Sequence, residues 1–242
     1  MQLSVATYNI QHGRIHPLYL ETQQETVDAV RMAEVIREMD VSVCGLNEVY
    51  DRVPGLGNQA QIIGEHLNWH HAFTEAISLS RGGLYGNALV SAHPIVALRS
   101  VPIVTRPEER GPEKHYENRV LLIATLDVNG TEVTVMSCHF GLNPLEADRA
   151  TETVLREAEA IRTPLIFMGD LNLTPEHPNI RKLAEFFTDS ATVGDGNRFT
   201  FPSHAPVKKI DYIFAKNCEI IASDVPEKVC SDHLPVRATV RL

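Results

Sequence analysis

The chain has 242 residues, 43% of them hydrophobic and 22% charged, which suits one globular domain or two small ones. Its formal net charge of -9 argues against a broad basic face that binds a polyanion, although a metal ion can supply the positive charge that a phosphate requires. No apolar run approaches the ~20 residues needed to span a bilayer, and the N-terminus lacks the features of a signal peptide. We therefore expect a cytoplasmic protein without stable membrane insertion, formed by a single domain over residues 1–242.

The spacing of apolar residues predicts the elements of the first half of the chain. Residues 25–40 repeat apolar side chains near helical spacing, which is typical of an amphipathic helix. The full set expected here is a strand at 3–10, the helix at 25–40, a strand at 41–49, a shorter helix at 58–67, and two strands within 84–104 that join at His93-Pro94.

The second half begins with a polar stretch at 105–118, rich in proline and charge, which predicts an exposed loop. This loop either meets a small phosphorylated ligand or is simply solvated. Asn129-Gly130 between two β-rich runs predicts a hairpin within 120–140. The remaining expected elements are a helix at 145–161, a strand at 164–170, a helix at 177–187, and strands at 208–216 and 234–242. Strands outnumber helices, so the sequence predicts an α/β fold of two packed, mostly antiparallel sheets with helices outside.

Acids, amides and imidazoles interrupt the apolar strands, mostly where a strand ends. They are Asn9, Glu48, His139, Asp170, Asn172, Asp211, Asp232 and His233. Each alone is typical of a turn or of a hydrogen-bonded core residue. As a converging set they would place buried carboxylates close together, which requires a cation or a proton between them. Oxygen ligands with histidine nearby fit a hard divalent cation such as Mg²⁺.

The stretch PLIFMGDLNLTP, residues 164–175, joins a buried strand to two of these polar residues. Alternate side chains of an extended chain point the same way. We therefore expect Asp170 and Asn172 on one face, with Leu171 turned to the other.

Six short motifs extend this pattern over nearly the whole chain, from Asn9 to His233. In order, they are TYNI, GLNEV, SCHF, MGDLNLTP, IDYIF and SDHLPV. The ordered set, and above all GDxN followed by SDH, resembles the endonuclease/exonuclease/phosphatase superfamily. That superfamily includes DNase I-like nucleases, exonuclease III-type abasic-site endonucleases, inositol polyphosphate 5-phosphatases and neutral sphingomyelinases. The resemblance implies a DNase I-like, four-layer α/β/β/α sandwich and a Mg²⁺-dependent hydrolase of phosphoester bonds, with Mn²⁺ as a substitute ion.

The resemblance also implies a role for each polar residue. Glu48 is expected to be the principal metal ligand, with Asn9 and Asp232 as direct or water-mediated ligands. His233 matches the active-site histidine of the family and Asp211 its orienting acid. The pair either activates water or, with His233 charged, stabilises the transition state.

Five further residues complete the site that the resemblance implies. Asp170 would orient or deprotonate the attacking water, and Asn172 would donate its amide to a phosphate oxygen. His139 resembles a second phosphate-binding histidine, with Glu75 as its carboxylate partner. Arg119 either reaches the phosphate or supports the site, and Tyr116 falls where some relatives carry a phosphate-contacting tyrosine.

The sequence leaves the substrate open between several phosphoesters. Lys and Arg total 22 against 31 acids, and no basic run exceeds two residues. We expect a phosphodiester or phosphomonoester, either a nucleic acid or a small molecule. The alternatives are a lipid or inositol phosphate, as for a phosphatase or a sphingomyelinase-type enzyme, and an inert phosphate-binding module. Completeness of the acid, amide and histidine set favours catalysis.

Overall fold

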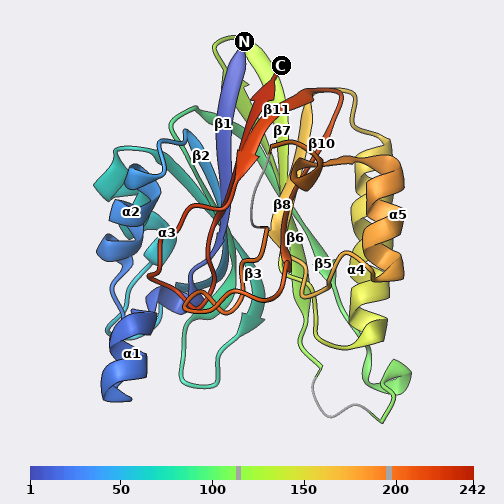
Figure 1. Cartoon of the computed structure of the whole chain (residues 1–242). Coiled ribbons are helices and arrows are strands. Elements are labelled where there is room, and N and C mark those ends of the chain that lie inside the picture. The colour runs from blue at the N-terminus through green and yellow to red at the C-terminus, as the bar shows by residue number, and fades with distance from the viewer. Residues whose placement is uncertain (113–115, 195–197) are drawn as a thin grey trace.

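Two six-stranded β-sheets face each other at the centre of the computed structural model, which describes residues 1–112, 116–194 and 198–242 (Figure 1). The first sheet has the strand order β11-β12-β1-β2-β4-β3. Its strands are β1 (Gln2–Asn9), β2 (Val43–Asp51), β3 (His70–Ser78), β4 (Leu84–Ser91), β11 (Glu219–Asp224) and β12 (Val236–Arg241).

The second sheet has the order β5-β6-β7-β8-β10-β9. Its strands are β5 (Ile95–Ile103), β6 (Arg119–Val128), β7 (Thr131–Cys138), β8 (Leu165–Asp170), β9 (Thr188–Asp189) and β10 (Asp211–Lys216). The hairpin between β6 and β7 turns at Asn129 and Gly130, both with positive φ, as the sequence predicts.

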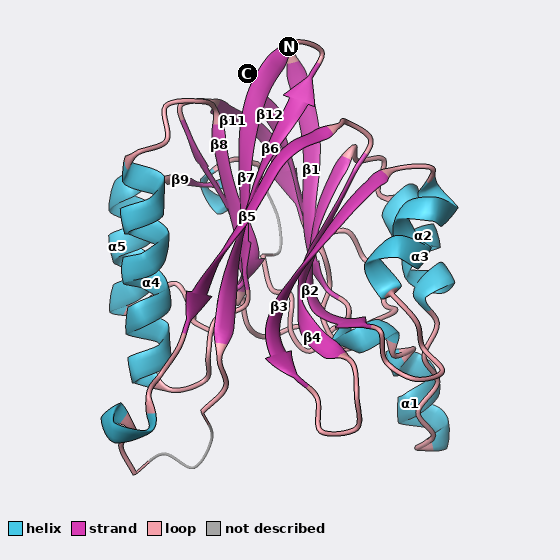
Figure 2. Ribbon diagram, turned by 180° about the vertical axis from the view of Figure 1, so that it is seen from behind, coloured by secondary structure: helices cyan, strands magenta, loops and turns pink. Residues whose placement is uncertain are grey.

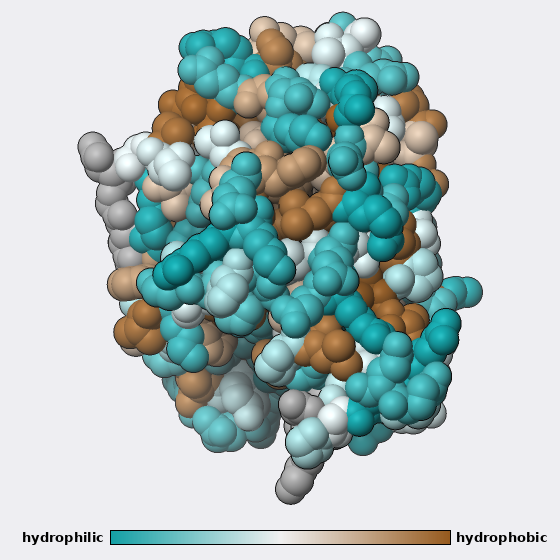
Figure 3. Space-filling model, turned by 90° about the vertical axis from the view of Figure 1, so that its right-hand side faces the viewer, coloured by the Kyte–Doolittle hydropathy of each residue, from teal (hydrophilic) through white to brown (hydrophobic). Residues whose placement is uncertain are grey.

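Helices cover the outer face of each sheet, so the sandwich has the predicted four layers (Figure 2). The helices are α1 (His16–Thr22), α2 (Ala29–Glu38), α3 (Gln59–Leu67), α4 (Pro144–Glu159) and α5 (Pro178–Phe186). The side chain of Asp28 caps α2 and that of Asn143 caps α4, each accepting from a backbone N–H of the first turn. The outer face over α4 and α5 is largely hydrophilic (Figure 3). No helix among the described residues is both long and apolar enough to cross a membrane.

Three apolar layers hold the sandwich together. The central layer packs the inner faces of the two sheets, and an outer layer lies between each sheet and its helices. Gly45 on β2 lies against Met168 on β8, so close that an added Cβ would fall 2.7 Å from the methionine Sδ. The two sheets are therefore in close contact at this point.

The pairing is antiparallel except for β1 with β2 and β7 with β8, which are parallel. A parallel pair needs a crossover connection, and here helices supply it. Consequently the C-terminal ends of the paired strands meet at one end of the sandwich, opposite to the chain termini (Figure 1). This arrangement decides where the polar strand ends lie.

The sequence analysis did not predict helix α1 or strands β3, β9 and β11. β3 and β11 are the two edge strands of the first sheet, and several of their side chains are exposed, so their apolar signal is weak. The strand expected at 208–216 begins only at Asp211. In the loop expected at 105–118, Pro107–Glu109 form a 3-10 turn, and residues 113–115 lie outside the described residues.

Candidate active site

Asn9, at the end of β1, connects the two sheets. Its side-chain amide donates to Oε1 of Glu48 at 2.9 Å and to Oδ2 of Asp170 at 3.0 Å. Glu48 belongs to β2 in the first sheet, whereas Asp170 ends β8 in the second. The amide is fully buried and its own oxygen accepts the backbone N–H of Gln11 at 3.0 Å. One amide therefore holds a carboxylate of each sheet in place.

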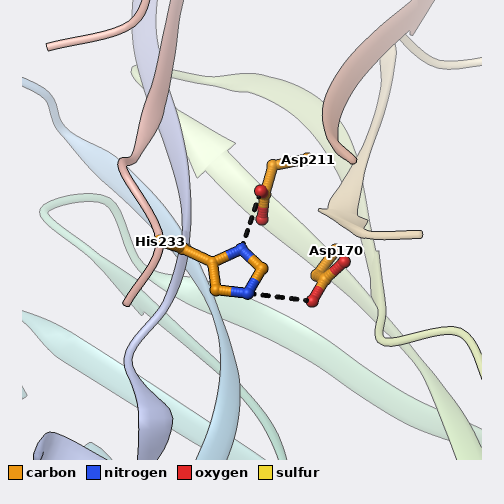
Figure 4. A group of neighbouring side chains, drawn as sticks. All are labelled: Asp170, Asp211 and His233. Carbon is orange, nitrogen blue, oxygen red and sulfur yellow. Dashed lines mark hydrogen bonds and ion pairs between the residues drawn. The ribbon is translucent and has the colours of Figure 1, made fainter. Parts of the chain in front are cut away.

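His233 lies between the carboxylates of two neighbouring strands (Figure 4). Asp211 on β10 is directly opposite Asp170 on β8. Nδ1 of His233 is 2.9 Å from Oδ2 of Asp211, and Nε2 is 3.6 Å from Oδ2 of Asp170. Burial opposes a charge on His233, but Asp211 and Asp170 outweigh it and raise the pKa of the imidazole to about 10. His233 is therefore held as an imidazolium.

Burial also raises the pKa of Asp170, and the nearby charge of Asp211 adds to the effect, while His233 opposes it. A carboxylate with a raised pKa is a stronger proton acceptor than an ordinary one. The backbone N–H of Asp170 donates to Oδ1 of Asn47 at 2.8 Å, which fixes the end of β8. The position of this carboxylate is thus set from both sheets.

His139 follows β7 directly, and its Nδ1 faces the guanidinium of Arg119. The guanidinium of Arg119 lies 3.1 Å from Nδ1 of His139, and it can only donate. Burial first, and then the charge of Arg119, holds the pKa of His139 well below its ordinary value, so the ring is neutral. The contact with Arg119 favours a proton on Nε2, which lies 3.4 Å from Oδ2 of Asp170.

Asn172 reaches the site through a turn, which corrects the expectation of an extended chain after Asp170. The residue has a φ of 53°, in the left-handed region that asparagine tolerates, and its N–H donates to Oδ1 of Asp170 at 2.9 Å. Its side-chain nitrogen donates to the carbonyl of Phe140 at 3.1 Å and is also 3.1 Å from Nε2 of His139, where it could donate only if Nε2 carried no proton. The two polar side chains converge because the backbone turns and not because they alternate.

Glu48 and Asp232 form the oxygen-rich part of the cluster. Glu48 has a φ of 57° beside an irregularity in the β2–β4 register, which takes it out of the regular strand. Burial raises the pKa of Glu48, Asn9 opposes this, and the charge of Asp232 adds to it. Asp232 accepts from Nε2 of Gln11 at 2.8 Å and from Oγ of Ser231 at 3.1 Å. Two such carboxylates beside an amide fit the ligand preference of Mg²⁺.

A second group of ligand-type atoms lies close by. One atom each from Asp170, Asp211 and His233 falls within 4.8 Å of the others, as a metal site would require. The 2.9 Å contact of His233 with Asp211 engages Nδ1 and Oδ2, and Oδ1 of Asp211 is buried without a hydrogen-bond partner among the described residues, but an imidazolium cannot ligate a metal. The all-oxygen group around Glu48 is therefore the better match to a hard cation, and the His233 group to proton chemistry.

Two expected residues lie outside this cluster. Glu75, expected to support His139, is exposed on β3, and its carboxylate accepts from Oγ of Ser78 at 2.6 Å. That expectation is wrong, because Arg119 occupies Nδ1 of His139 instead. Tyr116 accepts the backbone N–H of Gly111 at 2.6 Å within its own loop, so its contact with a phosphate stays a prediction.

Sequence reasoning missed several buried polar residues that position the cluster. Asn47 accepts from Asp170 and donates to Asn87 at 2.9 Å, and Asn87 donates to the carbonyl of Val120 at 2.8 Å. Burial raises the pKa of Tyr85. The charge of nearby Glu48 raises it further, and the charge of Arg119 lowers it. The available signal was an amide inside an apolar strand, as in GLNEV and YGNALV.

The sequence matches the model of the endonuclease/exonuclease/phosphatase family over residues 6–233. The chain therefore belongs to that family, whose members are phosphoesterase hydrolases. None of the curated proteins matches it significantly.

Solved structures with this fold include an endonuclease/exonuclease/phosphatase from Beutenbergia cavernae, with 25% identity and a TM-score of 0.76, covering 100% of this chain and 72% of that one. A mannosyl-6-phosphatase from Bacteroides thetaiotaomicron has 15% identity and a TM-score of 0.79, covering 99% and 100%. TDP2 from Caenorhabditis elegans has 16% identity and a TM-score of 0.69, covering 100% and 75%. The latter two likenesses show the shared DNase I-like fold alone.

Proposed function

We propose that the protein is a divalent-metal-dependent phosphoesterase that hydrolyses a phosphodiester or phosphomonoester by direct attack of water. The observation that carries the proposal is the amide of Asn9, which holds Glu48 and Asp170 side by side. A metal-type carboxylate and a proton-accepting carboxylate are thereby fixed next to each other. No covalent enzyme intermediate is required.

Glu48, Asn9 and Asp232 would hold the ion, with Mg²⁺ as the expected species and Mn²⁺ as a substitute. When bound, the ion supplies a positive charge that polarises a phosphoryl oxygen. The assignment rests on the carboxylates of Glu48 and Asp232 and on the mutual repulsion of their charges, while Asn9, whose nitrogen faces Glu48, would ligate only through its oxygen.

The remaining residues divide the chemistry between proton acceptance and charge stabilisation. Asp170 accepts the proton of the attacking water, because its carboxylate is buried and its pKa is raised. His233, kept as an imidazolium by Asp211, donates to a phosphate oxygen as negative charge develops. This favours the stabilising role of His233 over the alternative that it is the base.

His139 and Asn172 would supply two further donors to the phosphate. Nε2 of His139 and the side-chain nitrogen of Asn172 are 3.1 Å apart, and with a proton on Nε2 both groups would donate toward a phosphate oxygen rather than to each other. Arg119, buried behind His139 and paired with Glu117 at 2.9 Å, is then a positioning residue that fixes the tautomer. The net charge of -9 favours a small phosphoester over a long nucleic acid, since the latter draws on clustered cations.

The test is a panel of phosphoesters incubated with the purified chain and Mg²⁺, Mn²⁺ or EDTA. The panel holds plasmid DNA, abasic duplex, RNA, sphingomyelin, inositol phosphates and a bis-aryl phosphodiester. We expect hydrolysis that EDTA abolishes and that His233→Ala lowers strongly. Failure to cleave any of them with either metal would contradict the enzyme assignment and favour a phosphate-binding module.

A further inference from the structure

A cavity of about 760 Å³ lies near Glu48, which interacts electrostatically with His12 and Tyr50 in its lining. Its size lies within the range of small-molecule binding pockets. Residues from four separate segments line it, and those that the following argument uses are His12, Glu25, Tyr50, Leu56, Leu79 and Arg81.

Two residues of the cavity wall are close in sequence to residues of the candidate metal site. His12 directly follows Gln11, which contacts both Asn9 and Asp232, and Tyr50 stands two residues after Glu48. A ligand whose phosphoryl group lay among these polar residues would therefore extend its remaining part toward the cavity.

Buried Gln59 ties the two walls together. Its Nε2 donates to the carbonyl of His12 at 2.6 Å, and its Oε1 accepts the backbone N–H of Tyr50 at 2.9 Å. The side chain is fully buried, so these bonds are shielded from water. The wall is thus fixed before any ligand arrives.

The lining combines aromatic and aliphatic side chains with polar ones. The rings of His12 and Tyr50 stack with centroids 4.7 Å apart and an interplanar angle of 17°. The apolar remainder consists of Val27, Val53, Pro54, Leu56 and Leu79. Stacked rings beside aliphatic side chains suit a flat ring that can pack face to face with them.

The charges of the cavity narrow the choice of ligand further. Glu25 is already paired, with Arg14 at 2.7 Å and with Nε2 of His12 at 3.0 Å. Arg81 has no hydrogen bond or ion pair with any other described residue. The single unpaired guanidinium among the described residues of the lining, that of Arg81, cannot neutralise a polyanionic group. Charged side chains at the rim also disfavour the binding of a long acyl chain.

We propose that this cavity binds the organic part of the substrate, and that this part is a flat aromatic ring about the size of a nucleobase. The inference rests on the proposed phosphoesterase function, because the phosphoryl group is taken to lie at Glu48 and Asp170. The ring stacks against the His12–Tyr50 wall, and Arg81 contacts polar atoms on its edge.

The test compares two non-hydrolysable probes, phenylphosphonate and methylphosphonate, by isothermal titration calorimetry with the full chain and Mg²⁺. The probes share the phosphonate and differ in the ring. We expect phenylphosphonate to bind about tenfold more tightly, as for one stacked ring. Leu56→Trp, which fills the cavity, is expected to abolish the preference, whereas Leu98→Trp on the exposed face of β5 retains it. Tyr50→Leu is expected to weaken it and Tyr50→Phe to keep it.

Equal binding of the two probes, or a preference that survives Leu56→Trp, would overturn the cavity assignment even if the enzyme hydrolyses phosphoesters. A ring preference that Leu56→Trp removes, in a protein that cleaves nothing in the substrate panel, would support the cavity while overturning the proposed function. The two failures are therefore distinguishable.

Discussion

Asp211 lies directly opposite Asp170 across the β8–β10 pair, yet only Asp211 makes a short contact with His233. The 2.9 Å contact fixes Nδ1 of the ring and leaves Nε2 directed toward Asp170 at 3.6 Å. Two carboxylates on neighbouring strands thus differ in role because one histidine is shared unequally between them. In the proposed mechanism Asp211 orients the ring and Asp170 accepts a proton.

Replacing Asp211 by asparagine tests this division. The change removes the charge that stabilises the His233 imidazolium, so the pKa of His233 is expected to fall toward its ordinary value. We expect kcat to drop about 100-fold or more, the size of a lost general acid–base or charge-stabilising group. NMR titration of the His233 ring and steady-state kinetics measure the two effects. Wild-type kcat in the folded variant would rule out the orienting role.

Replacing Arg119 by methionine tests the assignment of the His139 tautomer. Without the guanidinium, Nδ1 of His139 loses its donor, and the proton is free to move from Nε2 to Nδ1. Nitrogen-15 NMR of the imidazole reports that shift directly, and we expect activity to fall about tenfold or more. Arg119→Lys, which keeps a donor, is expected to restore part of both signals. An unchanged tautomer in the methionine variant would contradict the positioning role.

Glu48→Gln separates the cost of a buried carboxylate from its use as a metal ligand. Because burial raises the pKa of Glu48, the neutral amide is expected to leave the melting temperature in EDTA equal to or higher than that of the wild type. Mg²⁺ is expected to raise the melting temperature of the wild type, since a ligand of the native state stabilises it, but not that of the variant. A variant that Mg²⁺ stabilises as strongly as the wild type would exclude Glu48 as the principal ligand.

We predict that Lys209, which is not a candidate metal ligand, makes the stability of the protein depend on pH. Burial lowers its pKa to about 8, although Asp189 lies 3.2 Å from Nζ and opposes the shift. The unfolded chain, with an ordinary lysine pKa of ~10.4, binds more protons than the native state between these values. The free energy of unfolding should therefore rise with pH across this window, by at most about 3 kcal/mol from this group.

Urea unfolding of the wild type and of Lys209→Met at several pH values between 7 and 10.5 measures that contribution. The wild type should gain stability relative to the variant as the pH rises. Lys182→Met, at an exposed position of α5, serves as the matched control and should follow the wild type. A constant difference between wild type and Lys209→Met would disprove the linkage.

The sequence predicted the two-sheet fold and most strand ends because apolar periodicity is a local property that buried strands must satisfy. The edge strands β3 and β11 escaped because an edge strand need not be apolar on both faces. Glu75 was misassigned for a different reason. Which side chain faces Nδ1 of His139 depends on how β6 packs beside β7, and spacing along the chain carries no trace of that.

Asn172 shows a further limit of sequence reasoning. Alternation placed it beside Asp170 correctly in space, but through an extended backbone that the structure replaces by a left-handed turn. Asparagine tolerates both conformations, so the residue type alone does not choose between them. The turn is closed locally by the carboxylate of Asp170 and held by the carbonyl of Phe140, which is distant in sequence.

The hydrogen bonds that Asn9 makes to Glu48 and Asp170 link the geometry of the candidate site to the packing of the apolar interior. Glu48, which would bind the metal, belongs to the first sheet, and Asp170, which would accept a proton from water, belongs to the second. Their alignment therefore depends on how the two sheets pack against each other. Loss of a methyl group from the central apolar layer, which includes Val5 and Met168, would shift the two sheets relative to each other, and misplacement by about an ångström is enough to reduce catalysis severely. Selection for catalytic activity would therefore constrain the apolar layer between the two sheets as strongly as it constrains the polar residues at the end of the sandwich.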